Sequence, residues 1–421
     1  MNVKNSKIIK PELLAPAGDM ERLIAAVRYG ADAVYLGGTV FGMRAGPANF
    51  TDSELHKAVE YAHNHGVKVY LTCNVLPRSN ELEELPSFLI NAKEAGVDAF
   101  IISDLGVLEY AKKYAPGVEI HISTQTGIVN YAAALAFYKM GAKRVVTARE
   151  LSMDEIRMLR SNIPEDMDIE CFVHGAMCVS FSGRCLISNY LVNRDANKGE
   201  CAQPCRWNYR LVEEKRPGQY FPVGEDEGGT YILNSKDMCM IEHIPEMIKA
   251  GITSFKIEGR AKSAYYVAVV TNAYRKAIDA YMENPSDDFM PEKWIVDEMT
   301  KISYRDYCTG FFYGDPSDDA QISYKGGYNR EWDVMAIAEK QENGIVYCSQ
   351  RNRFFEGDTL EVMEVGKKPY TVVAKNLRNE DGEAIESTNH PMMKFTFECD
   401  LPIEDNAILR KQREEAGRVI I

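Results

Sequence analysis

Short apolar runs alternate with amphipathic helical patterns between residues 11 and 260. The first helical pattern ends at Gly30 and the second at Gly66, where glycine is a typical helix stop. The junction from helix stop to apolar run recurs as GADAV, GVDAF, GAKRV and GITSF. Apolar strands between amphipathic helices indicate a parallel sheet covered by helices. The likeness of the units favours a TIM-like (β/α)8 barrel over a doubly wound open sheet.

The pattern changes to a period of two from about Arg330 onward. WDVMAIAEK, GIVYCSQ, DTLEVMEV, YTVVAKN, MKFTFEC and AILRK read as short strands separated by turns such as NEDGE. We therefore predict an α/β protein in which the large barrel is followed by a small C-terminal β-barrel. The expected divisions are 1–284 for the first barrel with a cysteine-rich insertion at 170–240, 285–327 for a connector and 328–421 for the β-barrel. REEAGRVII reads as a ragged tail.

Polar residues follow several of the predicted barrel strands. In this fold the functional site lies at the carboxyl ends of the strands, so these side chains are candidates for it. The catalytic candidates are His174, Lys256, Glu258 and Arg260. The substrate-binding candidates are Arg44, Asn74, Gln125 and Arg149. Asp104 also follows a strand, and for any single residue a helix cap or a salt bridge at the rim is the competing explanation. Three charges in FKIEGR are more than a packed strand end needs.

The chain carries a formal net charge of −13, which argues against non-specific nucleic-acid binding but leaves room for a local basic cleft. No stretch approaches the roughly 20 apolar residues of a membrane span, so we expect no membrane association. The first residues lack a secretory pattern, which predicts a cytoplasmic protein. In that reducing compartment, clustered cysteines are more often metal-binding or catalytic than disulfide-bonded.

Six of the ten cysteines lie between residues 171 and 239, with the spacing C-x6-C-x6-C-x15-C-x3-C-x33-C. Structural zinc prefers two close cysteine pairs, and only Cys201 and Cys205 approach such a pair. Scattered thiolates without histidine partners fit an iron–sulfur cluster better. Four of the six would be needed, and Cys171 lies in a strand-like run where a buried thiol is the simpler explanation.

The stretch ECFVHGAMCVSFSGRCLIS resembles the signature of the U32 peptidase family. Matching positions include Glu170, Phe172, Gly175, Cys178 and Cys185. PELLAPAG, GADAVYLG, HISTQT and FKIEGR are similar to other stretches of the family, in the same order along the chain. The resemblance covers roughly residues 10–421 and also implies a small β-barrel in the C-terminal part.

The resemblance further implies a function. The better-understood members are oxygen-independent hydroxylation proteins that carry a [4Fe-4S] cluster and depend on prephenate. Branch members with a long chain and an added C-terminal domain form 5-hydroxyuridine at the wobble position of tRNA. Carried over by position, the cluster ligands are Cys178, Cys185, Cys201 and Cys239, with Cys205 as a possible substitute for Cys201. The expected partners are tRNA and a second U32 family chain.

Two alternatives stay open on the sequence. One is the collagenase-type peptidase that the family label suggests, although the sequence offers no convincing set of nucleophile, base and orienting acid. The other is a non-catalytic iron–sulfur subunit that assembles with a related chain.

Overall fold

The structure is a computed structural model. It describes residues 8–42, 49–178, 187–192, 194, 200–204, 224–226, 229–231, 235–314 and 328–419. Apart from its last two residues, the chain divides into two compact units. The first unit contains residues 1–291 and 305–327, and the second contains 292–304 and 328–419. The segment expected as a connector is therefore shared between the two units, because the chain enters the second unit, returns to the first and leaves it again.

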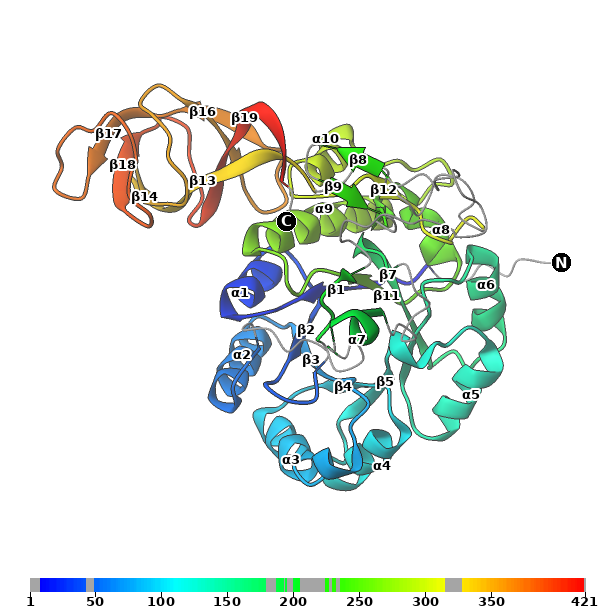
Figure 1. The fold of residues 1–421 in the computed structure, drawn as a ribbon. Helices are drawn as coiled ribbons and strands as arrows, with labels where there is room; N and C mark the ends of the chain where they lie inside the picture. The colour runs from blue at the N-terminus through cyan, green and yellow to red at the C-terminus, as the bar shows by residue number, and fades with distance from the viewer. Residues whose placement is uncertain are drawn as a thin grey trace, which may run out of the picture. The chain divides into compact units, whose positions relative to one another are not determined.

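Eight parallel strands close into a barrel in the first unit (Figure 1). They follow one another in chain order, and the last strand pairs with both the first and the seventh. This closure confirms the predicted TIM-like barrel and excludes the open sheet. The strands are β1 (Glu12–Pro16), β2 (Ala33–Gly37), β3 (Lys68–Cys73), β4 (Ala99–Ile102), β5 (Glu119–Ile122), β6 (Arg144–Val146), β7 (Asp168–Ala176) and β11 (Ser254–Ile257).

Helices cover the outside of the barrel (Figure 1). Most begin at a side chain that accepts a hydrogen bond from the first turn, as Asp19, Thr51, Asn130 and Ser152 do. The helices of the unit are α1 (Met20–Arg28), α2 (Asp52–Asn64), α3 (Leu85–Ala95), α4 (Leu105–Tyr114), α5 (Tyr131–Lys139), α6 (Met153–Ser161), α7 (Ile187–Val192), α8 (Ile244–Lys249) and α9 (Ala264–Glu283). In the part of the chain that the structure describes, no helix is both long and apolar enough to cross a membrane.

Strand β7 is longer than its neighbours and continues past the closed barrel. Its last residues pair antiparallel with β10 (Asp237–Cys239), which in turn pairs with β12 (Tyr307–Cys308). Two short strands, β8 (Gly224–Asp226) and β9 (Gly229–Tyr231), form a separate ribbon between β7 and β10 in the sequence. Because of this extension, Glu170 pairs with the barrel strand β11, whereas His174 also pairs with Cys239 of β10.

The second unit is a curled antiparallel sheet of seven strands in the order β16-β15-β19-β13-β14-β18-β17. Its core includes Val346, Leu360, Phe395, Phe397 and Leu409. The strands are β13 (Tyr328–Glu342), β14 (Ile345–Gln350), β15 (Thr359–Met363), β16 (Tyr370–Val373), β17 (Lys375–Asn379), β18 (Lys394–Glu398) and β19 (Ala407–Val419). The short helix α10 (Lys293–Asp297) belongs to the same unit.

The expectation of a ragged tail was wrong for most of REEAGRVII. Residues up to Val419 continue β19, and their backbone pairs with the start of β13 from Tyr328 to Arg330. A strand can accept charged side chains when its backbone has a partner, and the sequence pattern of the tail does not reveal that partner.

Candidate functional site

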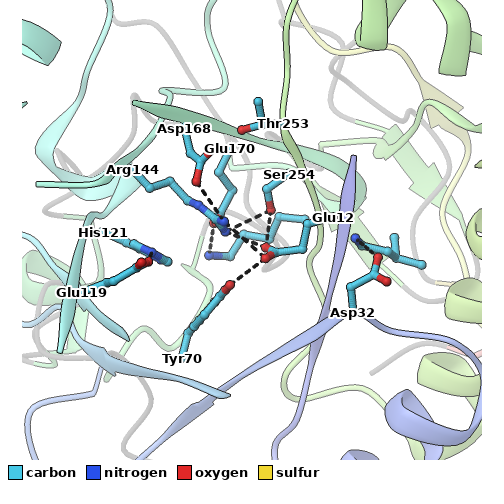
Figure 2. A network of polar contacts seen from close by, with 12 residues as sticks. Glu12, Asp32, Tyr70, Glu119, His121, Arg144, Asp168, Glu170, Thr253 and Ser254 are labelled. Atoms are coloured by element: carbon cyan, nitrogen blue, oxygen red, sulfur yellow. Dashed lines mark hydrogen bonds and ion pairs between the residues drawn. The ribbon is translucent and has the colours of Figure 1, made fainter. Parts of the chain in front are cut away.

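A network of ion pairs links several strands of the barrel (Figure 2). The Arg144 guanidinium lies between two carboxylates, 2.6 Å from Glu12 Oε1 and 3.1 Å from Glu170 Oε2. Lys256 Nζ lies 2.7 Å from Glu170 Oε1, and the Tyr70 hydroxyl donates to Glu12 Oε2 at 2.6 Å. The residues come from β1, β3, β6, β7 and β11, so the network ties together strands that are far apart in the sequence. The two cations neutralise these two carboxylates, as buried charges require, and the partly exposed Asp168 carboxylate also lies 3.5 Å from Arg144 Nη2.

Both carboxylates of this network are held in the ionised form. Burial alone would raise the pKa of Glu12, but the Arg144 charge and the hydrogen bonds from Arg144, Tyr70 and Ser254 outweigh it and lower the pKa to about 2. Burial likewise opposes ionisation of Glu170, whose pKa is nevertheless lowered by Lys256 and Arg144. Lys256, a predicted catalytic residue, is 4% exposed, and its ammonium group forms an ion pair with Glu170.

Arg149, which follows β6, contacts both Phe172, in the middle of β7, and Glu258, which follows β11. The Arg149 guanidinium lies 4.0 Å from the centre of the Phe172 ring, and its Nη2 is 3.7 Å from Glu258 Oε2. Lys256 Nζ is 5.3 Å from the same ring centre. A cation stacked on an aromatic face keeps its N–H groups at the edge of the guanidinium plane, where a carboxylate can bind. The structure thus brings together the predicted Arg149, Lys256 and Glu258.

Arg260 lies apart from this group, near the ends of β2 and β3. It is 6% exposed, and its Nη1 donates to Thr72 Oγ1 at 2.8 Å. A Cβ atom on Gly37 would lie 2.6 Å from Arg260 Nη1 and 3.0 Å from Asn49 Oδ1. The glycine therefore makes room for the guanidinium. Thr72 and Asn49 were not among the sequence candidates, although a threonine in an otherwise apolar strand is a usable signal.

The remaining candidates are placed less tightly. Asn74 follows β3 and is partly buried, while the Gln125 amide oxygen accepts from Ser103 Oγ at 3.3 Å. Asp104 caps α4 by accepting from the Val107 backbone N–H at 3.0 Å. Arg44 lies outside the described residues.

His174 is 1% exposed and faces three tyrosines, and we call these four residues the tyrosine cage. The ring centres of Tyr266, Tyr274 and Tyr307 lie 6.0, 5.6 and 5.4 Å from that of His174. Burial, with a smaller contribution from Lys262, lowers the pKa of His174 to about 3, so the imidazole is neutral. Both of its ring nitrogens lack a hydrogen-bond partner in the described residues. Its predicted catalytic role stays a prediction.

Three of the four predicted cluster ligands fall within the described residues. Cys178 and Cys201 are exposed, whereas Cys239 is half-buried at the end of β10. Cys201 Sγ accepts from the Gln203 backbone N–H at 3.4 Å, a contact that suits a thiolate. Among the described residues, no three His, Cys, Asp or Glu side chains form a metal site, and Cys185 and Cys205 lie outside them. An all-thiol donor set beside an unpartnered imidazole fits a thiolate-bound cluster, and the ligand assignment stays a prediction.

Cys171 differs from these three, as the sequence suggested. It lies inside β7, where burial raises the pKa of its thiol to about 12, and its Sγ is 3.2 Å from Thr147 Oγ1. Burial raises the pKa of the Cys239 thiol to about 12 as well, so the pKa does not separate the two. What marks Cys171 as a packing residue is its position inside a barrel strand, 1% exposed and in contact with Thr147.

Comparison with known proteins decides the family. A sequence model described as Peptidase family U32 matches residues 18–322, and one described as Peptidase family U32 C-terminal domain matches residues 330–410. The chain belongs to peptidase family U32. The resemblance inferred from the cysteine-containing signature is thereby confirmed.

Relatives within the family carry different names. The tRNA hydroxylation protein P1 of Bacillus subtilis is 38% identical over 96% of this chain and 95% of its own. The uncharacterized protease MJ0090 of Methanocaldococcus jannaschii is 42% identical over 76% of this chain and 77% of its own. Among solved structures, the U32 peptidase Mk0906 is 16% identical, covers 62% of this chain and 97% of its own, and has a TM-score of 0.40.

Proposed function

We propose that this chain is an RNA modification enzyme that hydroxylates uridine at the wobble position of tRNA to 5-hydroxyuridine. The observation that carries the proposal is the match to a relative named for tRNA hydroxylation across both units, over 96% of this chain. A match over the barrel alone would support only a common fold. The match to this relative spans nearly the whole length and so includes the curled sheet as well.

The mouth of the barrel supports a carboxylate-bearing co-substrate, and we take prephenate as that compound. Arg149 is the leading anchor, because its guanidinium stacks on the Phe172 ring and lies at the long distance of 3.7 Å from the Glu258 carboxylate. Arg260 is the second anchor, at the ends of β2 and β3. Two arginines suit a dicarboxylate, since each guanidinium binds a carboxylate through two parallel N–H bonds. Lys256 is less suited, because Glu170 already neutralises it.

A [4Fe-4S] cluster on Cys178, Cys185, Cys201 and Cys239 is the proposed cofactor. When bound, it would supply electron transfer for an oxidation that uses no oxygen. The protein's own residues bind and orient: arginines hold the anionic co-substrate, Phe172 fixes one guanidinium plane, and Glu258 fixes its in-plane direction. Association with a second chain of the family stays a prediction.

A peptidase activity is the second candidate, favoured by the relative named as a protease. The geometry of the seven histidines argues against a nucleophile activated by histidine. All seven lie in the described residues, and within that part of the chain no serine, threonine or cysteine side chain is hydrogen-bonded to any of them. Five of the seven imidazoles have a hydrogen-bond partner, which is an asparagine, a carboxylate in two cases, a backbone carbonyl or a tyrosine.

Nucleoside analysis of tRNA tests the proposal. A strain without this gene and without a related copy should lose 5-hydroxyuridine derivatives, and the wild-type gene should restore them. Arg149→Met should lower the restored level about 10- to 100-fold, because a hydrogen-bonded charge is lost from the anchor. Arg157→Met, in an exposed pair on α6, is the matched control and should restore fully. Persistence of the modified nucleosides in the deletion strain would show that the proposal is wrong.

A further inference from the structure

His174 is a buried polar side chain with an unmet requirement. Its Nδ1 and Nε2 atoms both lack a partner among the described residues, although the residue is 1% exposed. Nearly all buried polar groups in proteins have at least one hydrogen-bond partner, so an orphan of this kind indicates a missing water, ion or ligand, or a functional role. A neutral imidazole has one N–H donor and one acceptor to satisfy.

Two of the caging tyrosines cannot supply that partner. The Tyr266 hydroxyl donates to the Glu258 backbone oxygen at 2.9 Å. The Tyr274 hydroxyl donates to the Val173 backbone oxygen at 2.8 Å and accepts from the Met240 backbone N–H at 2.9 Å. These bonds fix both rings against the strand backbone around His174. The tyrosine cage therefore holds the imidazole in place by ring contacts and leaves its nitrogens available.

Cys239 lies directly across the β7–β10 pairing from His174. The flanking bond from the Met240 backbone N–H to the Val173 oxygen, 3.0 Å long, makes this a non-hydrogen-bonded pair. In such a pair the Cα atoms are about 4.5 Å apart and the two side chains project to the same face of the sheet. Cys239 is half-buried as a residue, but its thiol is in hydrogen-bonding contact with the Tyr274 hydroxyl, so the sulfur lies against the tyrosine cage.

We infer that the His174 ring N–H donates a hydrogen bond to a sulfur atom of the iron–sulfur cluster bound at Cys239. His174 is then a positioning residue that tunes the cluster from inside the protein. The inference rests on the proposed function, because it requires the cluster. A reduced cluster carries one more negative charge than an oxidised one, so an N–H donor stabilises the reduced form and raises the reduction potential.

The test compares purified full-length proteins after anaerobic reconstitution of the cluster. His174→Phe keeps an aromatic ring in the cage and removes the donor, and His174→Gln keeps an N–H donor. His56→Phe, on the outer helix α2, is the control for the same substitution elsewhere. We expect equal iron and sulfide per chain, a lower midpoint potential and altered EPR g values for His174→Phe, and a potential closer to that of the wild type for His174→Gln.

The outcomes separate this inference from the proposed function. A wild-type protein that binds no cluster sinks the proposed function and the inference with it. A wild-type protein with a cluster, and a His174→Phe variant with the same potential and EPR spectrum, overturns the inference alone. If His174→Phe does not fold, His174→Leu replaces it, and the same downward shift is expected. An unchanged potential in His174→Leu also overturns the inference.

Discussion

At the scale of single residues, one arginine inside the barrel forms ion pairs with two glutamates. Arg144 contacts both Glu12 and Glu170, and Lys256 completes the neutralisation of Glu170. Glu170 is buried and Glu12 is mostly buried, so each would be unstable as an anion without these cations. The low pKa of Glu12 reports this balance and makes the stability of the barrel depend on pH.

Glu12 should make the barrel lose stability in acid. Its pKa falls from an ordinary value of 4.5 to about 2 in the folded state, so folding favours the ionised form. A lowered carboxyl pKa contributes stability that is fully present above about pH 4.5 and is lost as the pH falls toward 2. We expect stability from urea unfolding to fall more steeply in this window for the wild type than for Glu12→Gln, by up to about 1.4 kcal/mol per pH unit. Equal slopes would contradict the assignment.

At the scale of elements, β7 gives successive residues different tasks. Glu170 points into the ionic interior, Cys171 is buried beside Thr147, Phe172 supports Arg149, and His174 enters the tyrosine cage. Gly175 follows with a φ of 107°, a conformation that side chains rarely adopt. A Cβ atom there would lie 2.5 Å from the Glu258 backbone oxygen, which belongs to the chain leaving β11.

Gly175→Ala should therefore damage both folding and the site. The added methyl group must displace backbone that carries Glu258, and the positive φ adds strain, for a combined cost of at least about 1–3 kcal/mol. Gly117→Ala is a matched control, since Gly117 has a φ of 93° and open space where its Cβ would lie. We expect a lower unfolding midpoint for both variants, and a loss of 5-hydroxyuridine in complemented cells for Gly175→Ala alone. Full activity of Gly175→Ala would refute the close approach.

The elements were predictable because their signals are local. Apolar runs ending at glycines identified the barrel strands, and period-two runs identified the strands of the curled sheet. The buried network was not predictable, because Glu12 and Arg144 stand at strand starts, where charged residues usually face water. Asp104 and Arg149 follow strands in the same way, yet one caps a helix and the other lies in the mouth. The sequence pattern alone cannot distinguish the two roles, because the role of each side chain depends on which residues from other strands lie next to it.

At the scale of the whole molecule, each unit contains a buried arginine between two carboxylates. Arg144 has this role in the barrel. Arg410 has it in the second unit, where it is 0% exposed and lies 2.6 Å from both Glu298 Oε1 and Glu361 Oε1. Glu298 comes from the segment 292–304, so this ion pair joins that segment to the curled sheet of its own unit.

The two arginines provide a paired test of this division. Arg144→Met and Arg410→Met should each destabilise their own unit, by up to about 3–5 kcal/mol, since each breaks buried ion pairs. Lys256 stays beside Glu170, and Lys301 stays beside Glu298 and Glu361. Hydrogen exchange followed by mass spectrometry should show faster exchange in the barrel strands for Arg144→Met. For Arg410→Met, the faster exchange should lie in 292–304 and in the strands from β13 to β19. Uniform acceleration across both units by either substitution would contradict the division.

The ion pair between Glu298 and Arg410 also determines when the second unit can finish folding during translation. The carboxylate is synthesised 112 residues before the guanidinium that neutralises it. At about 5–20 residues per second, that interval lasts about 6–22 seconds. During it all barrel strands have been made, while β13 still waits for β19, its partner along most of its length. The second unit is therefore the last part of the nascent chain to close. A translation product that stops before Arg410 contains all the barrel strands joined to a sheet that lacks most of β19, the strand between β15 and β13.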